Sequence, residues 1–306
     1  MGVIMSAKIK IQQLTIGSIV VACFVCALKY WAYHITGSVA LYSDALESVV
    51  NIVAALAAWW AVKISLKPAD QDHPFGHHKA EYFSAIFEGT LIIVAAIMIL
   101  REAWSSFWDV EVSQEPGIWI GISAAASVIN YFWGLVLIRQ GKIHCSPALK
   151  ADGEHLITDV FGSFGILIGL VAAFVSGWAF LDPILAIIIA FHILWQGWKV
   201  VNNSVQGLMD VGVEFTETMR IYDIILENAC GAIEVHDLRT RVAGRAIFIE
   251  FHLVVPATMQ VGEAHQVCNQ IEEALEMEFE NARIIIHMEP ESEAKFSPSV
   301  MAVPLA

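Results

Sequence analysis

Two apolar stretches of the chain carry polar side chains at a spacing that could place them around a cation. Glu47 and Asn51 are four residues apart in the first stretch, and His155 and Asp159 are four residues apart in the second. A separation of four residues puts each pair on one face of a helix. If the two faces oppose each other, one imidazole and three oxygen donors can close a tetrahedron around a small divalent cation. Two carboxylates would balance its charge.

The cost of burying these side chains favours a functional interpretation. Ionisable groups are expensive in hydrocarbon and usually mark an ion or proton path, although polar side chains also join helices by hydrogen bonds. Both interpretations stay open for Asn51 alone, whereas Glu47, His155 and Asp159 together favour a metal site. Asp44 shares the face of Glu47 and Asn51. It could line an exit path or cap the helix N-terminus, and we favour the cap.

Apolar runs that could cross a membrane recur along the first two thirds of the chain. Hydrophobic residues make up 57% of its 306 residues, which is typical of a protein with several membrane spans and a soluble part. Each run exceeds the ~20 residues that a helix needs to cross about 30 Å of hydrocarbon. The predicted spans are 13–35, 39–63, 83–108, 117–139, 147–175 and 178–200.

Six spans place both chain ends on the same side of the membrane, and the basic residues select the side. Most Lys and Arg residues of this region fall in or beside one set of loops, whereas the opposite loops lack them; Lys29 and Arg101 are the exceptions. By the positive-inside rule, both termini are cytoplasmic. Glu47 and His155 then each lie about eight residues into the bilayer, or ~12 Å, which is near its middle.

The last third of the chain has the pattern of a small soluble domain. Five segments have the apolar periods of regular elements. The predicted helices are 213–230 and 259–279, and the predicted strands are 235–242, 246–255 and 283–289. The order αββαβ predicts a ferredoxin-like α+β domain with its helices on one side of a sheet. We therefore expect an all-α transmembrane domain with six helices over 1–209, a cytoplasmic domain over 210–290 and a disordered tail over 291–306.

Two further groups of residues could bind metal. In the loop after the second span, Asp70, His73 and His77 could hold one cation with a water as fourth ligand, or they could belong to a solvated turn. In the predicted soluble domain, four histidines and a carboxylate come from four different elements. Single histidines on a sheet are usually core or surface residues, but five such residues in one small domain are unusual. They are His236, His252, His265, His287 and Glu289.

Several motifs occur in order along the chain. They are TGSV at 36–39, SLKPADQDHPFGHHKAE at 65–81, ADGEH at 151–155, HDLRTR at 236–241 and IIIH at 284–287. Together they resemble the cation diffusion facilitator family, close to its bacterial zinc and iron exporter branch, from about Thr15 to Pro290. In that family the transport site resembles two acidic ligands on the second membrane helix together with an HxxxD pair on the fifth. The HxxxD pair is intact here as His155 and Asp159. Glu47 and Asn51 stand where that branch usually has two Asp, so this site has one carboxylate fewer.

The resemblance implies a homodimer in the inner membrane that exports divalent metal in exchange for protons by alternating access. Zinc is the first candidate, and iron(II), cobalt(II) and manganese(II) are alternatives. The resemblance also favours an accessory metal site at Asp70, His73 and His77. It implies a metal pair at the cytoplasmic dimer interface, where Glu289 replaces an Asp of close relatives. Metal and protons compete for such ligands, and an imidazole with a pKa near ~6.5 can exchange one for the other.

Other classes of protein fit the sequence less well. A membrane metalloenzyme would need a nucleophilic water and a general base, and the sequence contains no HExxH, GxSxG or phosphate-cradling glycine loop. A channel would use rings of like charge or carbonyl groups, and a metal sensor would not need paired ligands at mid-bilayer. The net charge of −14 argues against a nucleic-acid partner, because no basic face neutralises phosphates. We therefore predict a transporter and not an enzyme.

Overall fold

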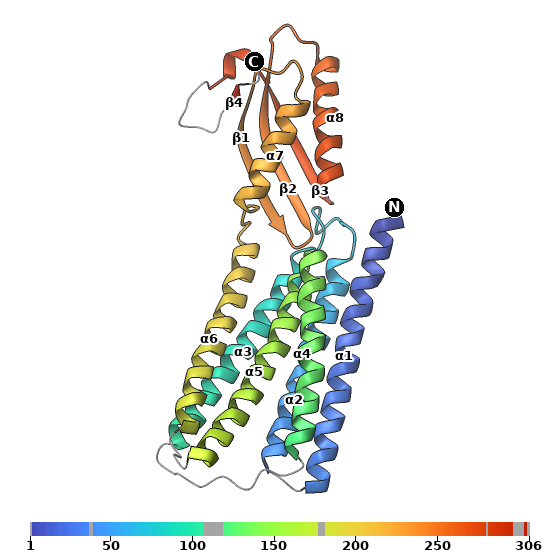
Figure 1. Ribbon diagram of the computed structural model, residues 1–306. Coiled ribbons are helices and arrows are strands. Elements are labelled where there is room, and N and C mark those ends of the chain that lie inside the picture. Colours follow the sequence, from blue (N-terminus) through green and yellow to red (C-terminus); the bar gives the residue numbers. More distant parts are fainter. Residues whose placement is uncertain are drawn as a thin grey trace. The chain divides into compact units, whose positions relative to one another are not determined.

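The computed structural model describes most of the chain as two compact units (Figure 1). The units are Met1–Val205 and Gln206–Ala306. The predicted domain boundary after residue 209 falls four residues beyond this division. The described residues are 2–36, 39–106, 119–176, 181–279, 281–295 and 303–304.

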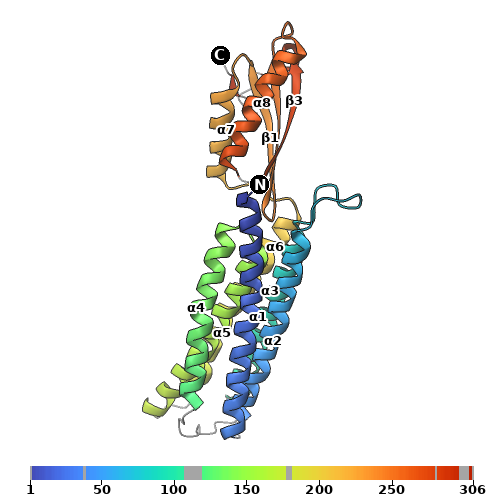
Figure 2. The same cartoon turned by 90° about the vertical axis from the view of Figure 1, so that its right-hand side faces the viewer.

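Within the described residues, the first unit is built from six long helices. They are α1 (Gly2–Thr36), α2 (Val39–Ser65), α3 (Ala80–Ser106), α4 (Trp119–Ile143), α5 (Pro147–Ser176) and α6 (Leu181–Leu208). In Figure 2, α1 lies against α2 and α4, and α4 runs along α5. α3 packs against both α2 and α5. Ile92 and Ala96 of α3 share a buried cluster with Ile193 of α6, which attaches the last helix to the bundle.

Four of these helices, α1, α2, α3 and α6, are long and apolar enough to cross a membrane when only their described residues are considered. The first half of α5 carries charged side chains, among them Asp152, Glu154 and Asp159. The prediction of a helical unit of membrane type is confirmed. The topology of six spans stays a prediction.

Two helices extend beyond the apolar runs that predicted them. α1 begins at Gly2 rather than at 13, because residues 2–12 contain Ala, Lys, Met and Gln, which favour helix, and no proline. α6 continues to Leu208 rather than ending at 200. Its end is set by Asp210, whose φ of 60° is left-handed, and by the N–H of Val211, which donates to the carbonyl of Gln206 at 3.1 Å. This is the pattern of a Schellman cap.

The second unit is an α+β domain. Its elements are α7 (Phe215–Asn228), β1 (Glu234–Ala243), β2 (Ala246–Val255), α8 (Val261–Glu278), β3 (Ala282–Pro290), a 3-10 helix η1 (Glu291–Glu293) and β4 (Val303–Pro304). The first five follow the predicted order αββαβ. The sheet order is β3-β2-β1-β4. β1 and β2 form an antiparallel hairpin, whereas β3 is parallel to β2 because α8 carries the chain back between them.

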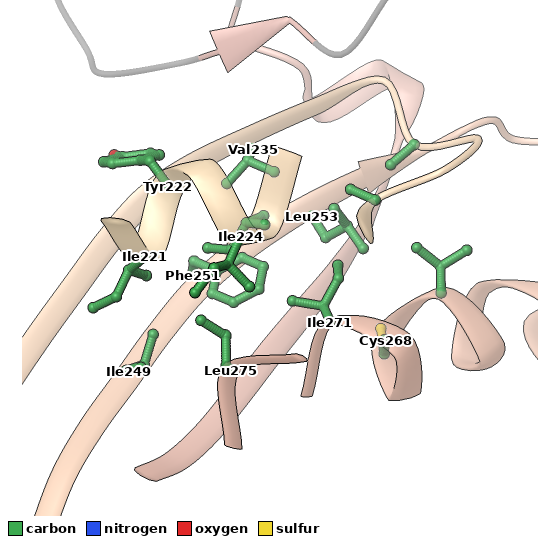
Figure 3. Packing of buried hydrophobic residues seen from close by; sticks show 14 of the residues in the cluster. Ile221, Tyr222, Ile224, Val235, Ile249, Phe251, Leu253, Cys268, Ile271 and Leu275 are labelled. Carbon is green, nitrogen blue, oxygen red and sulfur yellow. The ribbon is translucent and has the colours of Figure 1, made fainter. Parts of the chain in front are cut away.

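The core of this domain lies on one face of the sheet (Figure 3). Phe251 and Leu253 of β2 are buried against Ile221 of α7 and against Ile271 and Leu275 of α8. Side chains alternate between the faces of a strand. Because odd-numbered residues of β2 enter the core, His252 faces away from the two helices.

The segment after residue 290, for which we predicted disorder, contains two short elements among its described residues. η1 follows β3 directly, and β4 pairs antiparallel with the start of β1. The Nζ of Lys295 lies 2.6 Å from Oδ2 of Asp237, and its backbone N–H donates to Oε1 of Glu234 at 3.1 Å. These bonds attach residues 291–295 to β1, an attachment that the aperiodic sequence does not show.

Candidate metal sites

The first candidate site depends on the close packing of α5. A Cβ on Gly153 would lie 2.8 Å from the carbonyl oxygen of Gly134 and 2.9 Å from the backbone nitrogen of Ile138, so α4 and α5 approach backbone to backbone. α5 also contacts α2. The two residues after Gly153 bring the chain to His155. The packing of α4 against α5 therefore holds the imidazole at a fixed level facing α2.

Three of the four predicted ligands meet between α2 and α5. The Nδ2 of Asn51 donates to Oδ2 of Asp159 at 2.5 Å, and its Oδ1 lies 3.0 Å from Nε2 of His155. Asn51 and His155 are buried, and Asp159 is partly buried. The i, i+4 spacing of His155 and Asp159 puts both on the helix face that meets Asn51, as predicted. Asn51 thus joins the imidazole to the carboxylate.

The hydrogen bonds of this triad assign its protons. Because the amide nitrogen of Asn51 faces Asp159, its oxygen accepts from His155, which puts a hydrogen on Nε2. A cation at Nε2 needs the lone pair of that nitrogen, so it must displace this hydrogen. It would also replace the amide–carboxylate bond with metal–oxygen contacts. The triad can therefore hold either its internal hydrogen bonds or a cation, but not both.

The fourth predicted ligand, Glu47, lies on the described helix α2, but its side chain is outside the description, as is that of Asp44. Glu47 precedes Asn51 by four residues, so both occupy one face of α2. Its participation stays a prediction, and so does the capping role of Asp44.

The second candidate site is in the loop between α2 and α3. One ligand atom from each of Asp70, His73 and His77 lies within 4.8 Å of the others. Oδ1 of Asp70 is 3.3 Å from Nδ1 of His73, and Oδ2 is 3.4 Å from Nε2 of His77. The turn is closed by Gly76, whose φ of 87° favours glycine and whose N–H donates to the carbonyl of His73 at 2.9 Å. The loop thus gathers all three predicted residues.

Electrostatics favour an ionised carboxylate in this loop. The backbone N–H of His73 donates to Oδ1 of Asp70 at 2.7 Å, and this bond holds the pKa of Asp70 below its usual value. Asp70 and His73 are exposed to solvent, whereas His77 is mostly covered. A ligand set with an exposed, ionised carboxylate can exchange a cation with the surrounding water.

The third candidate site lies on the sheet face opposite the core, and Glu289 of β3 is at its centre. Oε1 of Glu289 is 2.7 Å from Nδ1 of His252 and 3.8 Å from Nε2 of His287. Its Oε2 is 3.2 Å from Nε2 of His236. Parallel pairing of β2 with β3 sets His252 beside His287. Four of the five predicted residues of the soluble domain are therefore brought together from three strands.

The donor atoms of this cluster converge without forming hydrogen bonds to one another. Nε2 of His236, Nδ1 of His252 and Oε2 of Glu289 have no hydrogen-bond partner among the described residues, although they lie within ion-pair distance. Their separations are short, but their angles are wrong for hydrogen bonds. Buried polar atoms normally find a partner. Nitrogen and oxygen donors that converge in this way suit a shared cation.

Two residues of this cluster were missed by the sequence prediction. Glu234 is buried, and its Oε1 is 2.9 Å from Nδ1 of His236. It fixes the ring so that Nε2 faces the cluster, which is the usual role of a carboxylate behind a ligand histidine. Asp237 offers an oxygen within 4.8 Å of ligand atoms of His236 and His252. The i, i+2 alternation in β1 could have revealed Glu234. Asp237 sits at a bulge with a φ of 52°, which the sequence pattern does not predict.

His265 is the predicted ligand that the structure does not bring to the cluster. It lies exposed on α8, between residues that pack into the core, such as Ala264 and Cys268. α8 covers the sheet face opposite Glu289. Within one chain, the described contacts of the cluster therefore come from the strands and not from this helix.

Comparison with known proteins identifies the family of this chain. The chain matches the model of the cation efflux transmembrane domain over residues 15–209 and the model of the cation efflux protein cytoplasmic domain over residues 214–291. The chain belongs to the cation diffusion facilitator family. This confirms the family that the motifs indicated. Members of this cation diffusion facilitator family are transporters, and the second matching model is one of a dimerisation domain.

Individual relatives of this cation diffusion facilitator cover most of its length. An uncharacterized transporter of Synechocystis sp. is 39% identical over 268 residues, which are 88% of this chain and 86% of that protein. The cation-efflux pump FieF of Yersinia pestis is 34% identical over 268 residues, 86% of this chain and 87% of the pump. The zinc form of CzrB, described as a zinc transporter, is 46% identical over 28% of this chain and 96% of that chain, with a TM-score of 0.27. The metal-bound C-terminal domain of the CzcD transporter from Thermotoga maritima is 28% identical over 27% of this chain and 100% of that domain, with a TM-score of 0.24.

Proposed function

We propose that this cation diffusion facilitator exports divalent cations from the cytoplasm in exchange for protons. The observation that carries the proposal is the buried triad of Asn51, His155 and Asp159 between two packed helices. Its members have the ligand types of a transition-metal site. In a family of cation efflux proteins, a metal-binding triad inside the helical unit is the natural transport site.

The exchange of metal for protons follows from the chemistry of the triad. The hydrogen-bonded form holds a hydrogen on Nε2 of His155. When the ring is an imidazolium with a second hydrogen on Nδ1, a dication that binds Nε2 releases one proton and leaves a neutral ring with its hydrogen on Nδ1, and departure of the dication allows a proton to return. Glu47, on the same face of α2 as Asn51, would supply the second carboxylate and balance the charge of the dication. Alternating access of this site to the two sides of the membrane completes the cycle.

The arrangement in the membrane is part of the proposal. We propose that all six helices span the inner membrane, with both termini in the cytoplasm, as the distribution of Lys and Arg indicates. α4 and α5 would be shielded from lipid on their charged sides by packing against α1, α2 and α3. The αββαβ order of the second unit supports a ferredoxin-like cytoplasmic domain.

The cytoplasmic cluster would bind metal at the interface of a homodimer and report the cytoplasmic metal level. His236, His252, His287 and Glu289 would be contributed by one copy of the domain. His265 lies on a different side of the same copy, and a second copy could supply it. Asp70, His73 and His77 would bind a further ion in the loop. No catalytic reaction is assigned to any of these sites.

Zinc is the proposed first cargo. One imidazole among oxygen donors also admits iron(II), cobalt(II) and manganese(II), and the amide of Asn51 in place of a carboxylate keeps these metals as alternatives. A growth-rescue panel with these four metals in a host that lacks its own exporters would rank them.

The test uses purified protein in proteoliposomes that contain a zinc-sensitive dye. Zinc transport should accelerate when a pH gradient is imposed in the direction that drives exchange. Asp159→Ala should abolish transport, while Asp223→Ala, an exposed carboxylate on α7, should leave it intact. Zinc movement that ignores the pH gradient would refute proton coupling. Full transport by Asp159→Ala would refute the site.

A further inference from the structure

A second group of buried acidic side chains lies one helical turn before the transport triad. Glu88 of α3 and Asp152 of α5 are buried, with exposed fractions of 0% and 2%. Ala85, Ala151 and Val200 form one buried cluster, so α3, α5 and α6 meet at this level. Glu88 is one turn after Ala85, and Asp152 directly follows Ala151. The two carboxyl groups are close enough for their charges to interact.

The hydrogen bonds of the two groups are few. Oδ2 of Asp152 accepts from Oγ of Ser18 on α1 at 2.5 Å, and Oε1 of Glu88 accepts from Oγ of Ser84 at 3.3 Å. Oε2 of Glu88 is buried and has no hydrogen-bond partner among the described residues. A fully buried oxygen of this kind normally has a partner. Oε2 of Glu88 therefore needs a bonding partner that the described side chains do not provide.

The charges around Glu88 indicate that this partner is a hydrogen on the carboxyl group. The charged neighbours that act on Glu88 among the described residues are Asp152 and Glu154, both acidic and both on α5. The ammonium groups of Lys150 and Lys199 act on Glu154 instead. An ionised Glu88 would thus be buried beside like charges with a single long hydrogen bond, which is very costly. A buried carboxyl group beside like charges keeps its proton, so Glu88 holds the proton of the pair.

The pair is also coupled to the cation site by position. Asp152 is three residues before His155 on α5, so both lie on neighbouring positions of one helix face. The charges of His155 and Asp159 act on Asp152. A dication that enters the triad brings two positive charges to within about one turn, or ~5 Å along the axis, of Asp152. The dication therefore favours release of a proton from the pair of Glu88 and Asp152.

We propose that Glu88 and Asp152 form a proton-carrying site that serves the transport cycle beside the cation ligands; the inference rests on the proposed function. When a dication occupies the triad, the O–H bond of Glu88 breaks, its electron pair stays on the carboxylate, and the proton leaves to water on the cytoplasmic side. When the dication departs outward, a proton from the outer solution forms the O–H bond again. One proton crosses the membrane through this pair in each cycle.

The test replaces Glu88 with its neutral isostere. Wild type and Glu88→Gln are reconstituted in proteoliposomes with a pH-sensitive dye and a zinc-sensitive dye, and the ratio of protons to Zn²⁺ moved is measured. We expect this ratio to fall by about one in Glu88→Gln, because glutamine cannot release a proton. Glu81→Gln is the matched control. Glu81 is also buried on α3, but its carboxylate accepts hydrogen bonds from Ser65 and Ser146, and its variant should keep the wild-type ratio.

The outcomes separate this inference from the proposed function. If wild type moves zinc without protons, the proposed function fails. If wild type exchanges protons for zinc and Glu88→Gln has the same ratio, the proton-carrying pair is refuted. Equilibrium dialysis must show as many Zn²⁺ ions bound to Glu88→Gln as to wild type, and loss of one ion would make Glu88 a metal ligand instead. Should Glu88→Gln not fold, Asp152→Asn must show the same fall in the ratio.

Discussion

At the scale of single residues, Asn51 decides the chemistry of the membrane site. Its amide donates to Asp159 and accepts from His155, so it bridges two ionisable groups without a charge of its own. A carboxylate at this position could not donate to Asp159. The amide thus stabilises the metal-free triad and lowers the affinity of the triad for a dication.

Asn51→Asp should bind zinc more tightly than wild type, because it removes the bridging donor and adds an anionic ligand. We expect an increase in affinity of about tenfold or more, which corresponds to ~1.4 kcal/mol. The affinity of the variant should also fall more steeply on acidification, because one more carboxylate can take up a proton. Isothermal titration of the purified protein at neutral and mildly acidic pH measures both effects. Asn51→Leu, which has no ligand atom, should bind more weakly than wild type, and weaker binding by Asn51→Asp would contradict this account.

Glu289 has the corresponding role in the cytoplasmic cluster, because its two oxygens face three histidines. In an Asp159→Ala background that silences the transport site, Glu289→Gln should lower the zinc affinity of the cluster by about tenfold or more. Glu250→Gln is the matched control, since Glu250 is exposed on β2 two residues before His252. Equal affinities of the two variants would exclude Glu289 from metal binding. The comparison is made by competition with a zinc chelator dye.

Site residues could be predicted from the sequence where they follow the regular spacing of a helix or a strand. The i, i+4 spacing in two apolar helices was enough to predict that Asn51 lies near His155 and Asp159. The alternation in β2 was enough to set His252 on the face opposite the core. Asp237 escaped because a bulge interrupts the alternation of β1. The proximity of Glu88 to Asp152 could not be predicted for another reason. It depends on which helices pack together, and residues 64 positions apart in the sequence share no period.

At the scale of elements, close packing of α4 on α5 holds the proposed transport site in place. Gly153→Ala would put a Cβ 2.8 Å from the carbonyl of Gly134, where only backbone can yield. We expect a loss of about 1–3 kcal/mol in the free energy of unfolding, and a larger loss of zinc transport because His155 lies two residues away. All ten tryptophans lie in the first unit, so their fluorescence follows its unfolding.

Gly162→Ala on the same helix is the control, because its Cβ would meet only Cδ1 of Ile193 at an ordinary 3.8 Å. This variant should keep its stability and its transport. A Gly153→Ala protein as stable as Gly162→Ala would show that the two helices can separate without cost, contrary to the packing described.

The segment 291–295 is attached to β1 through Asp237 and Glu234. The hydrogen bond from Nζ of Lys295 lowers the pKa of Asp237. Because the folded pKa is then below the unfolded value of about 3.9, the stabilisation is complete above that pH and is lost as the pH falls through the folded pKa. Lys295→Met should therefore speed hydrogen exchange in β1 at neutral pH by a small factor, since both side chains are partly exposed. The difference from wild type should vanish in strong acid, and mass spectrometry of β1 peptides measures it.

At the scale of the whole molecule, the fold is two units with separate cores. The order of elements was predictable because polar breaks separate the apolar periods. The exact ends of α1 and α6 were not, since helix propensity and a left-handed cap, rather than hydropathy, set them. The parallel pairing of β3 with β2 results from the crossover through α8. The order of elements alone does not predict which strands pair.

Because the second unit buries its own core between α7, α8 and the sheet, residues 206–306 should fold without the helical unit. We expect a cooperative thermal transition of this fragment in aqueous buffer, followed by circular dichroism. Zinc at about 100 times its dissociation constant should add ~2.7 kcal/mol of stability. For a domain of this size that raises the melting temperature by roughly 10–20 °C. The same fragment with Glu289→Gln should melt as a folded domain but show little of this shift, whereas an equal shift in both fragments would place the bound zinc elsewhere.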